Sequence, residues 1–180
     1  MKNEIKSEIV FETENLKFRK IIKDDFNNLS PILKDPEIMY AWEHGFSDEE
    51  VYNWIDENLK RYREDGFSYC IGIEKKSGNI IGMIGPLMEN INGKKQIGAG
   101  WILDKKFWGK GYAEEGGKGA VKYAFEKLGA EKVIAAIRTE NISSRKNAEK
   151  LGMKIEGSYV KIYRSKEMEH LIYAINKNKV

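Results

Sequence analysis

The stretch from Trp101 to Leu128 constrains the fold of this chain more than any other. It opens as a short apolar strand, turns through Gly109 and Gly111, and continues as a segment whose small or apolar side chains recur every three or four residues. That spacing places those side chains on one face of a helix. The sequence therefore predicts a strand that turns through two glycines directly into a helix.

This turn is a candidate anion site. The first N–H groups of a helix lack partners within the helix, and the helix dipole adds partial positive charge there. Gly109 and Gly111 can adopt positive φ, which lets a phosphate approach the main chain closely. Gly116, Gly117 and Gly119 lie inside the helix, where each costs about 0.5–1 kcal/mol relative to Ala. We therefore expect close packing of this helix on a sheet to offset that cost.

Two familiar phosphate loops do not match the turn. A P-loop requires lysine where Gly117 stands, and the dinucleotide fingerprint requires glycine where Glu114 stands. Two alternatives remain open at this point. The loop could serve a nucleotide-binding module of another kind, or the helix start could pack tightly and bind nothing.

The bulk properties favour one soluble domain. With 180 residues, the chain is expected to form a single domain over residues 1–180. No apolar run approaches the roughly 20 residues of a membrane helix, and no secretory segment follows the start. The single cysteine, Cys70, fits a reducing cytoplasm. A net charge of +3 is too weak to indicate nucleic acid, and His44 and His170 lack the neighbours of a metal site.

The rest of the chain alternates between strand and helix patterns. We expect a first strand within residues 9–22, helices at 26–33 and after Ser47, and strands at 68–73, 80–88 and 96–103. After the central helix follow a strand at 132–137, a helix within 139–151, and strands at 154–164 and 170–175. Residues 89–94 are expected to form a long hairpin turn, and Pro86 to cause a bulge or an interrupted ladder. The order indicates one α/β or α+β domain.

The strand–helix–strand unit over residues 97–137 requires parallel strands with a right-handed crossover. A ligand would bind where the first of these strands ends. A second strand–helix junction, at residues 137–144, faces the same way. The two strands would therefore splay apart around a cleft with an anion-binding floor.

Three motifs resemble the GNAT N-acetyltransferase superfamily. Residues 106–115 (KFWGKGYAEE) look like its acyl-CoA pyrophosphate loop, Q/R-x-x-G-x-G/A. Residues 141–153 resemble its second motif, N-x-x-S-x-x-x-x-E-K-x-G-F. Residues 13–19 (TENLKFR) are similar to the T-E-R-L-x-L-R start of the RimJ/RimL-like branch, which includes ribosomal-protein N-terminal acetyltransferases. The first two motifs, paired and in order, form a specific signal.

The resemblance implies a GNAT-like fold, with a mixed central sheet of about seven strands splayed at the cofactor cleft and flanked by about four helices. It also implies a cytoplasmic acyltransferase that is a monomer or homodimer. The enzyme would move acetyl from acetyl-CoA to a primary amine, either a protein N-terminus or a small amine, by direct attack in a ternary complex. No metal, nucleic acid or membrane would take part. The alternative is a non-catalytic CoA-binding or regulatory domain on the same scaffold.

The resemblance also assigns site residues. The pyrophosphate would lie on the amides of Gly109–Ala113, the pantetheine arm would pair with Trp101–Leu103 like an added strand, and Ser144 would lie near the sulfur as the catalytic candidate. The expected cofactor contacts are Trp101, Ile102, Leu103, Trp108, Gly109, Lys110, Gly111, Tyr112, Ala113, Asn141, Ser144 and Lys146. The expected acceptor contacts are Tyr40, Trp42 and His44.

Three positions depart from the family pattern. Lys106 replaces the usual Gln or Arg at the start of the loop. Ala148 stands where many members have a tyrosine acid, so protonation of the thiolate would fall to Ser144, to water or to no side chain. Gly98 stands where this branch often has a glutamate, so the sequence identifies no general base. An α-amine, with a pKa of about 8, needs less help than a lysine at about 10.4.

Overall fold

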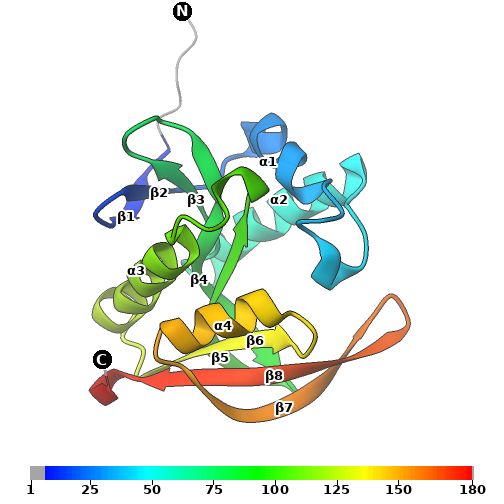
Figure 1. The fold of residues 1–180 in the computed structure, drawn as a ribbon, viewed down its shortest axis with the longest axis vertical. Coiled ribbons are helices and arrows are strands. Elements are labelled where there is room, and N and C mark those ends of the chain that lie inside the picture. Colours follow the sequence, from blue (N-terminus) through cyan, green and yellow to red (C-terminus); the bar gives the residue numbers. More distant parts are fainter. Residues whose placement is uncertain (1–6, 180) are drawn as a thin grey trace, which may run out of the picture.

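The computed structural model describes residues 7–179 (Figure 1). It contains eight strands and four α-helices. In chain order these are β1 (Ile9–Glu12), β2 (Leu16–Lys20), α1 (Phe26–Leu33), α2 (Asp48–Glu64), β3 (Cys70–Glu74), β4 (Ile80–Ile91), β5 (Lys94–Leu103), α3 (Tyr112–Lys127), β6 (Lys132–Arg138), α4 (Ile142–Lys150), β7 (Lys154–Tyr163) and β8 (Lys166–Asn176).

All eight strands belong to one sheet, in the order β1-β2-β3-β4-β5-β6-β8-β7. Every neighbouring pair is antiparallel except β5 and β6, which are parallel and are connected along the chain by α3. This confirms the mixed sheet and the parallel strand–helix–strand unit. The count is eight rather than about seven because residues 9–22, expected as one strand, form the antiparallel pair β1 and β2.

Alternating side chains of the central strands divide the core between the two faces of the sheet. Ile71 of β3 and Met83 of β4 face one way and pack with residues of α1 and α2. Cys70 and Ile84, their neighbours along the strands, face the other way and pack with α3. This alternation follows from the two-residue period of a strand. Both faces of the sheet are therefore apolar, and helices cover both of them (Figure 1).

The glycines inside α3 allow this helix to lie unusually close to the sheet. A Cβ atom on Gly116 would come within 2.5 Å of the Ile84 Cδ1 atom, and one on Gly119 within 2.6 Å of the Thr13 Cγ2 atom. Both distances are far below ordinary contact. The expected close packing of α3 is therefore confirmed.

A carboxylate on the first turn of α3 holds the start of the folded chain. Glu115 accepts hydrogen bonds from the Thr13 hydroxyl at 2.5 Å, the Asn15 backbone N–H at 2.7 Å and the Asn15 side-chain amide at 2.9 Å. The turn between β1 and β2 is thereby attached to the helix that begins at the glycine turn. This contact gives the Thr13-Glu14-Asn15 motif a structural role.

The β4–β5 hairpin differs from the sequence expectation. Its strands pair without interruption to Ile91 and Lys94, and the turn is only Asn92 and Gly93, both with positive φ (51° and 84°). The expected long turn over residues 89–94 is wrong. Of the two alternatives at Pro86, the bulge is wrong, because Pro86 pairs in register with Ala99, whereas the ladder is interrupted on the side of β3. Pairing of β3 with β4 ends at Ile84, so Pro86 lies where one side of β4 has no strand partner and a missing N–H is tolerated.

The sheet opens between its two parallel strands. Only Gly98 of β5 and Ile134 of β6 are paired, and beyond them the strands diverge. The described part of β5 from Ala99 to Leu103 is therefore bonded to β4 on one side and to no strand on the other. Across residues 7–179, no helix is both long enough and apolar enough to pass through a membrane.

Candidate active site

The glycine turn adopts the conformation that its sequence requires. Gly109 and Gly111 have φ of 76° and 79°, and Gly111 precedes α3 without a side chain to cap the helix. The Trp108 indole N–H donates to the Leu103 carbonyl at 3.1 Å and fixes the turn to the end of β5. No atom lies within 4 Å of where a Cβ would stand on either glycine. The main chain here forms an open cradle that suits a diphosphate.

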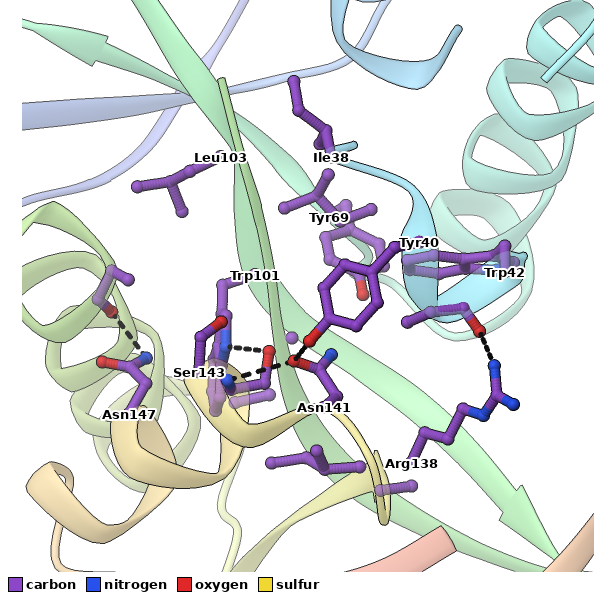
Figure 2. A pocket seen from close by; sticks show the side chains of 18 of the residues that line it. Ile38, Tyr40, Trp42, Tyr69, Trp101, Leu103, Arg138, Asn141, Ser143 and Asn147 are labelled. Carbon is purple, nitrogen blue, oxygen red and sulfur yellow. Dashed lines mark hydrogen bonds between the residues drawn. The ribbon is translucent and has the colours of Figure 1, made fainter. Parts of the chain in front are cut away.

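The second strand–helix junction begins at Asn141 (Figure 2). Its side-chain oxygen accepts from the Ser144 backbone N–H at 3.2 Å and so caps α4. The same oxygen accepts from the Tyr40 hydroxyl at 2.5 Å, which reaches across from the 3-10 helix Tyr40–Trp42. The Asn147 amide donates to the Ala113 carbonyl at 3.1 Å and joins α4 to the start of α3. The two helix starts therefore meet at one opening.

Ser144 is held with its proton free for another group. Its Oγ accepts from the Trp101 indole N–H at 3.2 Å, so the serine O–H can donate to another group. Ala148, where the family often has a tyrosine acid, is fully buried and lines no part of the opening. The Tyr40 phenol does line it, and burial raises the pKa of that phenol. Ser144, the hydroxyl that the sequence pointed to, is therefore in contact with Trp101 on the open edge of β5.

One cavity of about 1030 Å³ connects the glycine turn to this junction and continues beyond it. It is lined by thirteen of the fifteen residues that the sequence assigned to cofactor or acceptor. The two others, Lys110 and His44, do not line the cavity, although the backbone of Lys110 belongs to the glycine turn. The Lys110 ammonium lies 5.0 Å from the Phe107 ring, and His44 contacts the Trp42 carbonyl at 2.9 Å and Glu50 at 2.8 Å.

The loop that carries Tyr40 and Trp42 is fastened to the far side of the cavity. Glu43, at φ 66°, pairs with Arg138 at 2.9 Å and with Lys166 at 2.5 Å, and both cations hold the pKa of its carboxyl below the ordinary value. Arg138 also donates to the Ala41 carbonyl at 3.3 Å. This loop is thus attached to the end of β6 and to the start of β8.

The far end of the cavity contains side chains that the sequence did not single out. Its wall is largely aromatic, with charged groups among the rings. These residues are Trp54, Arg61, Tyr69, Glu89, Tyr159, Lys161 and Tyr163. They come from α2, β4, β7 and the segment before β3, so only the fold brings them together.

Glu89 is the most notable of these missed residues. It lies on β4, and burial raises the pKa of its carboxyl. The expected turn over residues 89–94 hid it, because a residue in a turn has no fixed face. The Asn92-Gly93 pair was the available signal, since this dipeptide specifies a two-residue hairpin and would have extended β4 through Glu89.

Two other kinds of chemistry find no support in the described structure. Among residues 7–179, no cluster of three or more His, Cys, Asp or Glu could hold a metal ion. Cys70 is buried, and burial raises the pKa of its thiol to about 12. A thiol with so high a pKa is a poor nucleophile.

Together, the open glycine cradle, the bare edge of β5 and the second helix start beside them define a CoA-dependent acyltransferase. The comparison with known families makes this more specific. Residues 15–154 match the family described as "Acetyltransferase (GNAT) domain", so the chain belongs to the GNAT acetyltransferase family. It is an acetyl-CoA-dependent N-acetyltransferase.

Individual proteins agree with this assignment. The chain is 33% identical over 122 residues to the FsC-acetyl coenzyme A-N(2)-transacetylase of Aspergillus fumigatus, covering 62% of this chain and 50% of that protein. It is 25% identical over 150 residues to the Bacillus subtilis N-acetyltransferase YnaD, covering 83% and 85%. RimL, a ribosomal L7/L12 alpha-N-protein acetyltransferase, has the same fold, with a TM-score of 0.78, 16% identity and coverage of 94% of both chains.

Proposed function

We propose that this enzyme transfers acetyl from acetyl-CoA to a primary amine, a small amine or a protein N-terminus, by direct attack while both substrates are bound. One observation carries this mechanism. A single cavity of about 1030 Å³ runs from the glycine turn to the aromatic end, so it has room for a cofactor and an acceptor together. The buried thiol of Cys70 offers no route through an acetyl-cysteine.

The parts of the cavity suggest how the cofactor is held. The amides of Gly109–Ala113 would bind its diphosphate, with the α3 dipole behind them. The unpaired edge of Trp101–Leu103 would bond the amides of the pantetheine arm as an added strand. Lys146 and Asn141 line the same cavity and would contact the remaining parts.

Bound acetyl-CoA supplies a thioester whose carbonyl carbon accepts the amine and whose sulfur leaves. Ser144 is the proposed donor of a proton to that sulfur, because its oxygen is already occupied by the Trp101 N–H and its own O–H is free. A serine hydroxyl is a much weaker acid than a thiol, so Ser144 would hydrogen-bond the leaving sulfur and relay a proton to it, taking a replacement proton from water.

Thiol release from acetyl-CoA, measured across a panel of small amines and free N-terminal peptides, tests the proposal. We expect amine-dependent release and a product acetylated on nitrogen. Binding of CoA should be measured in parallel by calorimetry. Tight binding of CoA without turnover on any amine would instead favour a non-catalytic CoA-binding domain.

A further inference from the structure

We propose that Glu89 is the general base of this enzyme, and that the acceptor it serves is a singly charged primary amine on an apolar or aromatic body. This inference rests on the proposed amine acetylation and makes it more specific. The sequence had left the base unassigned, because Gly98 stands where a glutamate is often found.

Gly98 and Gly100 of β5 have no side chains, which makes room for Glu89 and Tyr69 to project into the far end of the cavity. A Cβ on Gly98 would lie 2.8 Å from the Cγ of Glu89, and one on Gly100 would lie 2.3 Å from the Tyr69 hydroxyl oxygen. Gly98 is paired with Leu87, two residues before Glu89 on β4, so all three face the same side of the sheet. The carboxylate absent from β5 is therefore replaced by one that projects from the neighbouring strand over the same spot.

Glu89 is available for a ligand. Within residues 7–179, its carboxylate takes part in no hydrogen bond within the protein and in no ion pair at contact distance, although it is only partly exposed and lines the cavity. The Glu89 oxygens reach the cavity, so an ammonium that enters it can form a charge-assisted hydrogen bond in a weakly solvated setting. An ammonium group is the partner of matching charge, and burial already raises the pKa of Glu89 toward that of a working base.

Charge near Glu89 limits what the acceptor can carry. Arg61 of α2 and Lys161 of β7 are close enough to lower the pKa of Glu89 partly, against the effect of burial. The other titratable groups of this end are Tyr69, Tyr159, Tyr163 and His170. One ammonium beside Glu89 is balanced, but a second positive charge on the same molecule would meet Arg61 and Lys161. A polyamine is therefore disfavoured.

The walls favour an apolar or aromatic carbon frame. The rings of Trp54 and Tyr69 lie 5.5 Å apart, and Trp42, Leu87 and Tyr159 complete the lining. Such surfaces bind flat apolar groups and also attract a cation to the ring faces. A molecule with an apolar or aromatic carbon frame and one ammonium group therefore matches both the aromatic walls and the Glu89 carboxylate at the far end of the cavity.

The proton balance of the step is simple. The Glu89 carboxylate removes one proton from the ammonium, and the freed nitrogen forms the C–N bond with the thioester carbon. The C–S bond breaks, and the second nitrogen proton that the amide does not keep ends on the leaving sulfur through Ser144 or water. Glu89 then releases its proton to solvent, so the products are the amide, the free thiol and one proton.

Glu89→Gln tests the base without changing the shape of the side chain. With phenethylamine as acceptor, we expect kcat/KM at pH 7 to fall by about 10²–10⁴-fold while CoA affinity stays within about twofold. The reduction in kcat/KM relative to wild type should become smaller as pH rises toward the pKa of the amine, about 10. More of the amine is then already deprotonated in solution, so the variant needs no base. A purely structural loss would not depend on pH in this way.

Matched variants separate the possible outcomes. Glu126→Gln removes an exposed carboxylate of α3 and should keep kcat/KM within about twofold. Gly98→Ala should push Glu89 aside and lower activity. Because its Cβ would also lie 3.1 Å from the Ile134 carbonyl oxygen, a loss should remain in the Glu89→Gln background, but a smaller one than in the wild type.

The outcomes that overturn the inference are distinct from failure of the proposed function. A Glu89→Gln enzyme within about threefold of wild type at pH 7, or a deficit constant with pH, overturns the role of the base. A preference for spermidine or for free N-terminal peptides over phenethylamine overturns the acceptor class. Wild-type enzyme that binds CoA but acetylates no amine refutes the proposed function itself.

Discussion

The glycine turn can be tested by comparing two glycines in the same conformation. Gly111 at the turn and Gly66 after α2 have φ of 79° and 87°, and at neither does any atom lie within 4 Å of the position that a Cβ would occupy. Alanine at either site should therefore cost only the strain of a left-handed backbone, about 1 kcal/mol. For a chain of 180 residues this lowers Tm by about 2–4 °C.

Only one of the two substitutions should affect the cofactor. At Gly111, the added Cβ would hinder a phosphate from approaching the main chain and remove about one charge-assisted hydrogen bond, worth about 1.5–3 kcal/mol. CoA affinity should then fall by about 10- to 150-fold in Gly111→Ala and stay unchanged in Gly66→Ala. Calorimetric titration with CoA, alongside thermal melts, makes the comparison. Equal CoA affinity in the two variants would refute the assignment of the turn.

Two further predictions concern the serine and the folded state. Ser144→Ala should lower kcat by roughly 10²-fold with CoA affinity unchanged, as measured by thiol release; an unchanged kcat would remove Ser144 from the mechanism. Burial raises the pKa of Asp25, but hydrogen bonds from Arg19 and the Ile22 N–H outweigh it and hold the pKa below 3.8. The Arg19–Asp25 pair therefore stabilises the fold above about pH 4, and this contribution is lost as pH falls through the lowered pKa. Arg19→Ala should lower the free energy of unfolding by about 3–5 kcal/mol at pH 7, and by less at pH 3, as measured by urea unfolding. An equal cost at both pH values would contradict this account.

The sequence alone predicted the structure correctly where a local backbone conformation, helix cap or close contact requires a particular residue type. Gly109 and Gly111 predicted the left-handed turn, because only glycine adopts it without strain. Asn141 predicted the start of α4, because its side chain caps the helix. The glycines inside α3 predicted close packing, because nothing else offsets their cost. Each of these conclusions needs only a few neighbouring residues.

The sequence was insufficient wherever distant segments must be set in register. Glu89 and Gly98 become neighbours only because the Asn92-Gly93 turn is two residues long and the pairing of β4 with β5 is unbroken. A long turn over residues 89–94, as the sequence predicted, would leave the direction of the Glu89 side chain undefined. Arg61 reaches the same end from α2 and Tyr159 from the edge strand β7, and no local pattern encodes that meeting.

The single pairing of Gly98 with Ile134 makes the middle of the sheet its least connected seam. Five strands lie on one side of this seam and three on the other, and they are bridged by α3, α4 and the loop that carries Tyr40 and Glu43. A ligand chain that bonds to the vacant edge of β5 would act as a temporary ninth strand. Occupancy would thus stiffen the whole molecule across its midline, and product release would require the enzyme to give up part of its own sheet.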